Sequence, residues 1–173
     1  MIYPEPSLEE FKKFSRVRIE ALNYALRGLP EDRIRYHICW GSWHGPHTTD
    51  IPLADIIDLV LAVRAQAYSV EAANVRHEHE WRVWQETKLP EGKIVVPGVV
   101  SHATNVVEHP RLVADRIIRF AKIVGRENVI ASTDWAAGFI RRSRGRSLLL
   151  LLRAQNSRAM SSGNSERYEG QPG

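Results

Sequence analysis

Apolar residues along the chain alternate between helical spacing and short extended runs. Ser7-Leu-Glu-Glu10 has the form of a capping box, and the helical stripe that follows it stops at Gly28. This pattern predicts a first helix over residues 7–27. Residues 33–40, rich in Ile, Tyr and Trp, predict a short strand that opens into a loop of turn-forming residues at 41–47.

The same order of strand, loop and helix then repeats. Thr49 or Asp50 can cap a second helix, whose apolar positions continue to Val63. The remaining pattern predicts a strand at 67–72, a helix at 78–86, a strand at 93–100, a helix at 110–124 and a strand at 128–133. Strands separated by helices of about ten to fifteen residues indicate βαβ crossovers and a parallel sheet.

Four such strands make about half of a (β/α)8 barrel, because a complete barrel needs at least about 200 residues. The sequence therefore predicts an α/β fold: a partial TIM-type barrel of about four βα units over residues 1–135. Half a barrel leaves two parallel edge strands and an apolar interior uncovered, so we expect self-association through the unpaired sheet edges. We also expect the chain to be a truncated product of a longer parent.

The amino-acid composition changes at the C-terminal end of the chain. The sequence pI near 9.5 would ordinarily suggest a nucleic-acid partner, but residues 136–173 hold seven arginines against two glutamates and carry a net charge of +5. Subtracting this from the whole-chain charge of +4 leaves residues 1–135 at −1. We therefore expect no specific nucleic-acid binding by the fold. Residues 136–173 are expected to be a disordered or frame-shifted basic tail, or else a tail evolved to bind acidic partners.

The chain has neither a run of 18 apolar residues nor the basic-then-apolar order of a signal peptide at its start, so we expect a cytoplasmic protein with no membrane partner. Its single cysteine cannot form an internal disulfide. Cys39 therefore suggests metal binding or catalysis.

His37 and Cys39 stand two residues apart on a predicted strand, so both side chains are expected on the same face. A thiolate and an imidazole suit zinc, and Glu71 at the next strand end would supply a third ligand. Three protein ligands with an open fourth position are typical of catalytic zinc. The alternative is that His37 and Cys39 are ordinary core-facing residues.

Other polar residues also fall at predicted strand ends, where functional groups of parallel sheets gather. His102 is a candidate for proton transfer, and Asp134 and His44 are candidates for substrate binding. His47 shares the loop of His44 and is a further candidate. The alternation of His and Glu over residues 76–80, which includes His77 and His79, predicts a solvated, salt-bridged face. The tryptophans are expected to pack helices onto the sheet or to line a pocket.

Several of these segments, in order, resemble the zinc-site region of cobalamin-independent methionine synthases. They are Tyr36-His-Ile-Cys39, Asp55-Ile-Ile-Asp-Leu-Val-Leu-Ala-Val63, Tyr68-Ser-Val-Glu71, Pro97-Gly-Val-Val100 and Asn105-Val-Val-Glu-His-Pro110. The likeness covers roughly residues 5–134 and is strongest to stand-alone proteins of the C-terminal type. Those have Trp-Gly-Ser-Trp-His-Gly-Pro-His after the cysteine and Glu-Ala-Ala-Asn-x-Arg-His-Glu-His-Glu after the glutamate.

The resemblance implies a zinc-dependent methyltransferase in which His37, Cys39 and Glu71 bind the metal. Zinc would hold homocysteine, or another small thiol, as a thiolate, and a reduced folate, 5-methyltetrahydrofolate polyglutamate, would supply the methyl group. No corrinoid would be needed. One alternative keeps the zinc thiolate but adds coenzyme M to epoxides, and another is an inactive remnant with a basic binding tail.

The chain departs from the family pattern at Trp135, where the family has a second metal-binding cysteine after Thr133-Asp134. Because tryptophan cannot bind zinc, three protein ligands at most remain, and weaker zinc affinity is expected. The arginine-rich composition begins just after the same position. A shifted reading frame would explain both changes, and the coding DNA around codon 135 tests this hypothesis.

Overall fold

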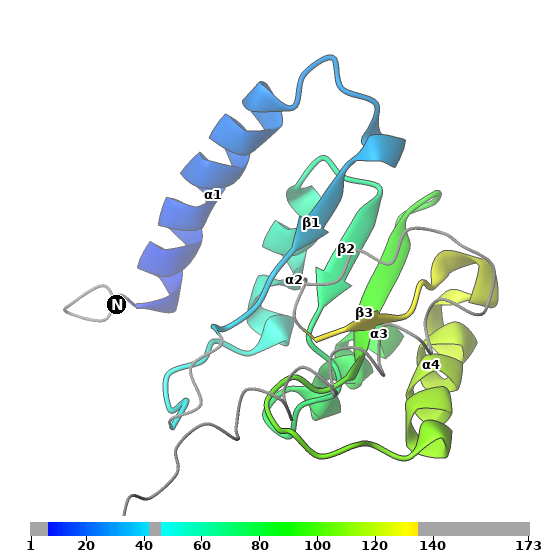
Figure 1. Cartoon of the computed structure of the whole chain (residues 1–173). Coiled ribbons are helices and arrows are strands. Elements are labelled where there is room, and N and C mark those ends of the chain that lie inside the picture. The colour runs from blue at the N-terminus through cyan, green and yellow to red at the C-terminus, as the bar shows by residue number, and fades with distance from the viewer. Residues whose placement is uncertain (1–6, 42–45, 135–173) are drawn as a thin grey trace, which may run out of the picture.

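The computed structural model describes residues 7–41 and 46–134, in which helices and strands alternate along the chain (Figure 1). The helices are α1 (Leu8–Ala25), α2 (Leu53–Ala62), α3 (Val83–Glu86) and α4 (Pro110–Val124), and the strands are β1 (Arg35–His37), β2 (Ala67–Val70), β3 (Ile94–Val100) and β4 (Ser132–Thr133). Three 3₁₀ turns connect them: η1 (Glu31–Arg33), η2 (Glu78–Arg82) and η3 (Arg126–Asn128).

The four strands form one parallel sheet in the order β1-β2-β3-β4. Tyr68 lies opposite Tyr36 on one side and opposite Val95 on the other. The pairing of β3 with β4 shifts between Gly98 and Val100. Consecutive strands are thus neighbours, and the sheet curls into half a barrel, which confirms the predicted partial TIM-type fold.

The hydrophobic core lies between the sheet and the helices that cover it (Figure 1). Its fully buried members include Leu53 and Val60 of α2, Tyr68 of β2, Val95 of β3 and Phe120 of α4. Each such side chain contributes about 1.5–3 kcal/mol when it leaves water. The core therefore holds β2 and β3, the two central strands, most firmly.

Helix α1 begins with the predicted capping box: the backbone N–H of Ser7 donates to Glu10 Oε2 (2.9 Å) and the N–H of Glu10 donates to Ser7 Oγ (3.3 Å). No residue of α1 is fully buried. The helix lies beside α2, where Asn23 donates to the carbonyl of Ala62 (2.9 Å) and accepts from the N–H of Arg64 (2.7 Å). These contacts use one side of α1 only.

Helix α2 begins later than predicted, and neither Thr49 nor Asp50 caps it. Its N-cap is Pro52, which makes no side-chain cap. The carboxylate of Asp50 instead contacts two histidine rings, and the N–H of Leu53 donates to a glutamate from another segment, Glu80 (2.6 Å). The predicted helix at 78–86 divides into η2 and α3, whereas the one at 110–124 has the predicted bounds.

Within the described residues, no helix combines the length and the apolar character that crossing a bilayer requires. The tail predicted at 136–173 lies outside the described part of the chain, as does Trp135.

Candidate functional site

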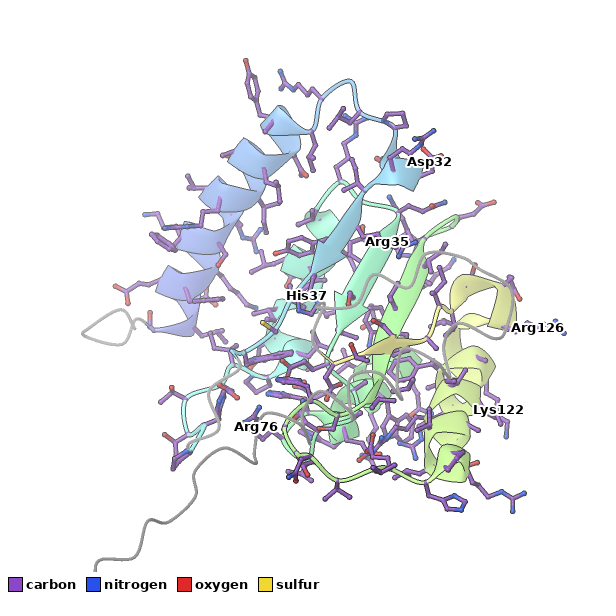
Figure 2. All side chains as sticks on the ribbon, in the orientation of Figure 1. Asp32, Arg35, His37, Arg76, Lys122 and Arg126 are labelled. Atoms are coloured by element: carbon purple, nitrogen blue, oxygen red, sulfur yellow. The ribbon has the colours of Figure 1, made fainter. Side chains whose placement is uncertain are left out.

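His37 ends strand β1 at the carboxyl edge of the sheet (Figure 2). Its Nδ1 and the hydroxyl of Ser69, on the neighbouring strand β2, share a hydrogen bond of 3.0 Å. Its Nε2 is buried and has no hydrogen-bond partner among the described residues. Burial, and then the charge of His102, lower the pKa of His37 below its ordinary value of 6.5. The ring is therefore neutral at pH 7.

Glu71 directly follows β2 and is only 2% exposed. Its Oε2 accepts a hydrogen bond from the side-chain amide of Asn74 (2.8 Å). Its Oε1 is buried and, within the described structure, accepts no hydrogen bond. Burial raises the pKa of this carboxyl, and the charge of Asp134 raises it further, against the lowering effect of the Asn74 hydrogen bond.

Asp134, the residue after β4, is fully buried. Its Oδ1 accepts from the backbone N–H groups of Ala72 (2.8 Å) and Ala73 (2.9 Å), and its Oδ2 accepts from Asn74 (3.2 Å). Burial raises the pKa of the Asp134 carboxyl, although these hydrogen bonds oppose it. Gly98 makes this position possible, since a Cβ there would overlap both the backbone and the side chain of Asp134.

His102 lies in the loop after β3 and is half-buried. Its charge lowers the pKa values of both His37 and Asp134, so its ring is within electrostatic range of both. The charge of Asp134 in turn raises the pKa of Glu71. The structure therefore brings together four residues that sequence analysis selected from four different strand ends.

Cys39 is placed differently from this group. It is exposed and, with Tyr36, Ile38 and Trp40, lines a cavity of about 430 Å³ between α1, the end of β1 and α2. In residues 7–41 and 46–134, no group of three or more His, Cys, Asp or Glu side chains is arranged to hold a metal ion. His44 lies outside the described residues.

His77 is a buried histidine at the centre of a charged network, and the prediction of a solvated face is wrong for it. Its Nδ1 contacts Glu80 Oε2 (3.0 Å), its Nε2 contacts Asp50 Oδ2 (3.1 Å), and its ring stacks on Trp40 at 4.0 Å. The ion pairing was predicted correctly, and His79 is exposed as expected. The Trp40 ring and the Asp50 carboxylate, both distant in sequence, explain the burial.

The charge state of His77 follows from its partners. Burial alone would lower its pKa, but the hydrogen bond and charge of Glu80, the charge of Glu71 and the hydrogen bond to Asp50 together raise the pKa above 6.5. Asp50 also contacts His47 Nδ1 (2.8 Å). The network thus ties the loop that follows Cys39 to the segment that follows Glu71.

Arg116 of α4 is a second buried charge that sequence analysis missed. Its guanidinium donates to Glu78 (3.1 Å), to Glu108 (2.6 Å) and to the carbonyls of Val99 (3.0 Å) and Ala73 (3.2 Å). Burial would lower the pKa of Arg116, but the hydrogen bonds and charges of the two glutamates raise it. One side chain thereby joins α4 to the segment that follows β2, to β3 itself and to the loop after β3.

Comparison with known proteins finds matches among solved structures, and none among family models or curated proteins. Among solved structures, the chain is similar to a B12-independent methionine synthase from Shewanella sp. W3-18-1 in complex with selenomethionine, with a TM-score of 0.60, 19% sequence identity and coverage of 90% of this chain. The match covers 46% of the synthase, so the chain spans about half of its length. At this identity the likeness is one of fold.

Proposed function

We propose that the chain carries the zinc site of a cobalamin-independent methyltransferase, which moves a methyl group from 5-methyltetrahydrofolate polyglutamate to the thiol of homocysteine and forms methionine. His37, Cys39 and Glu71 are the proposed zinc ligands. The ordered sequence motifs support this proposal, as does the fold shared with a methionine synthase. That synthase was solved with selenomethionine, an analogue of the proposed product.

The observation that carries the proposal is a pair of buried atoms, Nε2 of His37 and Oε1 of Glu71, which have no hydrogen-bond partner in the described structure. A buried polar atom without a partner costs about 1–3 kcal/mol. An imidazole nitrogen and a carboxylate oxygen are ordinary zinc donors. The donor types of these two residues therefore support zinc as the missing partner of both atoms.

The state of His37 also suits a ligand. Metal binding requires a neutral imidazole, and the lowered pKa of His37 favours that form at pH 7. When the Nδ1 proton is donated to Ser69, the lone pair remains on Nε2. A hydrogen bond on the second ring nitrogen is the usual way in which proteins orient a histidine ligand.

Cys39 would complete the set by turning its side chain from the cavity toward His37. It is exposed, so the thiol can rotate without displacing core residues. When bound, zinc lowers the pKa of a coordinated substrate thiol and so stabilises the thiolate at neutral pH. Because the family's fourth ligand falls at Trp135, three protein ligands are the most that we propose.

The other residues around the site have proposed roles that follow from their positions. His102 lies within electrostatic range of His37 and Asp134, and we assign it the proton released by the substrate thiol. The cavity beside Cys39 has mostly apolar walls, including Trp40, and can receive the uncharged part of a substrate.

Zinc binding by the purified chain tests the proposal. We expect one zinc ion per chain, and at least about a hundredfold weaker binding for Cys39→Ala, because a thiolate ligand is lost. A competing chromophoric chelator gives the Kd values. His79→Ala, which removes an exposed histidine outside the site, serves as the matched control and should bind zinc as the wild type does. Absence of stoichiometric zinc, or an unchanged Kd for Cys39→Ala, would contradict the proposal.

The substrate is tested separately with two thiols. We expect methyl transfer from 5-methyltetrahydrofolate polyglutamate to homocysteine and no addition of coenzyme M to an epoxide. The reverse result would favour the epoxide-directed transferase. A folded chain that binds no zinc and alkylates neither thiol would be an inactive remnant.

A further inference from the structure

Asn74 lies between two buried carboxylates and, like them, is almost completely buried (2% exposed). Its side-chain Nδ2 donates to Glu71 Oε2 (2.8 Å) and to Asp134 Oδ2 (3.2 Å). Its Oδ1 accepts from the backbone N–H groups of Arg76 and His77, each at 3.1 Å. Both amide protons and both oxygen lone pairs therefore have a partner.

These two donated and two accepted hydrogen bonds fix which way the Asn74 amide faces. The oxygen is held by two backbone donors, so the NH₂ group has to face the two carboxylates. A rotated amide would place its oxygen against Glu71 and Asp134, where acceptor would meet acceptor. Asn74 consequently keeps Oε2 of Glu71 hydrogen-bonded and leaves Oε1 as the oxygen to which no residue of 7–41 or 46–134 donates.

Asp134 controls the backbone around the same carboxylate. Its Oδ1 accepts from Ala72 and Ala73, the two residues that follow Glu71. Asp134 follows β4, whereas Glu71 follows β2, so the contact passes across β3 at Gly98, the position that has no side chain. Hydrogen bonds from within the chain occupy both oxygens of this fully buried carboxylate.

We propose that Asn74 and Asp134 are positioning residues for Glu71: Asp134 fixes the backbone beyond it, and Asn74 fixes the rotation of its carboxylate, so that Oε1 is presented to the metal. This inference rests on the proposed function. It gives Asp134 a role different from the substrate binding expected from sequence, because its oxygens face donors of the protein itself. Hydrogen bonds to a ligating carboxylate are a general means of tuning metal affinity.

Metal affinity of the full chain provides the first test. Asn74→Asp keeps the shape and the acceptor of the side chain but removes both donated hydrogen bonds. We expect zinc to bind roughly 10–100-fold more weakly, which is the usual effect of losing such a partner. Asn23→Asp is a matched control, since Asn23 also donates to one group and accepts from a backbone N–H, but far from Glu71. Its zinc Kd should stay within about twofold of the wild type.

A second measurement works without metal and separates this inference from the proposed function. In the zinc-free wild type, NMR should show both side-chain amide protons of Asn74 protected from exchange with water. Glu71→Ala should release the proton that faces residue 71, and Asp134→Ala should release the other, because an alanine side chain accepts no hydrogen bond. If the wild type shows this pattern but binds no zinc, the proposed function fails while the placement of Glu71 by Asn74 holds.

Two results would overturn the inference. One is a folded Asn74→Asp chain, judged by circular dichroism, whose zinc Kd equals that of the wild type. The other is fast exchange of both Asn74 amide protons in the wild-type chain. If Asn74→Asp does not fold, the amide protons of the wild type, Glu71→Ala and Asp134→Ala still decide the question.

Discussion

At the scale of single residues, His77 binds two acidic side chains from different segments, one through each ring nitrogen. Its folded pKa lies above 6.5, so the protonated form stabilises the fold. This stabilisation is complete below about pH 6.5, which is the ordinary pKa of a histidine in the unfolded chain. It is lost as the pH rises through the higher pKa of His77 in the folded chain. We expect His77→Gln to lower the free energy of unfolding by on the order of 3 kcal/mol at pH 6, because the buried Glu80 and the half-buried Asp50 lose their cation.

Urea unfolding between pH 6 and pH 9 checks this prediction. The difference between wild type and His77→Gln should shrink as the pH rises. His79→Gln changes an exposed histidine two residues away and should have the same pH dependence as the wild type. A difference for His77→Gln that does not vary with pH would show that the ring acts only by packing on Trp40.

The residues of the candidate site were largely predictable, because one rule applies to them all: the carboxyl ends of parallel strands meet at one edge. His37, Glu71, His102 and Asp134 follow that rule. His77 does not, since its alternation with acidic residues is the same as that of an exposed segment. Its burial depends on Trp40 and Asp50, which lie 37 and 27 positions away and carry no local signal.

At the scale of elements, the approach of β4 to β3 depends on Gly98. Gly98→Ala would place a Cβ against the backbone of Asp134, which cannot move without breaking the sheet. We expect this substitution to cost about 3 kcal/mol of stability in urea unfolding. It should also break the hydrogen bonds that the backbone N–H groups of Ala72 and Ala73 donate to Asp134, which amide exchange can detect.

Gly92→Ala is the control that separates close packing against Asp134 from the general effect of replacing a glycine. Gly92 has φ +74° and open space around its Cα, so alanine there is strained by its backbone alone, at about 1 kcal/mol. If Gly98→Ala costs no more than Gly92→Ala, close packing of β4 is not what the glycine provides.

The identity and order of the elements could be read from apolar spacing, but their ends could not. Strand β1 has only three residues, against eight predicted, because Arg33 belongs to the 3₁₀ turn η1 and the strand ends at His37. The start of α2 was missed because its first N–H group, that of Leu53, donates to Glu80 from another segment instead of to a local cap. Such long-range partners leave no trace in a short sequence window.

At the scale of the whole molecule, α1 exposes apolar side chains. Phe14, Val17 and Tyr24 are 44%, 63% and 66% exposed. Grouped apolar surface of this kind favours association. We expect the sedimentation coefficient of the wild type to rise with concentration, and that of the double variant Val17→Lys, Tyr24→Lys to stay constant.

The pair Val106→Lys, Val107→Lys adds the same charge at two exposed valines in the loop after β3 and should associate as the wild type does. If both double variants associate like the wild type, the open strand edges of the half-barrel are responsible, as sequence analysis expected, and not α1.

The half-barrel itself was predictable because strand count and chain length set it. The placement of Cys39 was not. The two-residue period of a strand predicts a common face for His37 and Cys39, but β1 ends at His37, and beyond it the alternation no longer directs the side chain.

Arg116 has a consequence for the order in which the molecule assembles. Its guanidinium is the shared partner of Glu78, Glu108 and the carbonyls of Ala73 and Val99. Ala73, Glu78 and Glu108 lie in the segments that follow β2 and β3, whereas Val99 belongs to β3 itself. Those segments cannot reach their final form until α4 has docked. We therefore expect the edge that bears Glu71 and Asp134 to become rigid only after α4 has docked, and amide exchange at Ala72 and Ala73 to quicken first when α4 detaches.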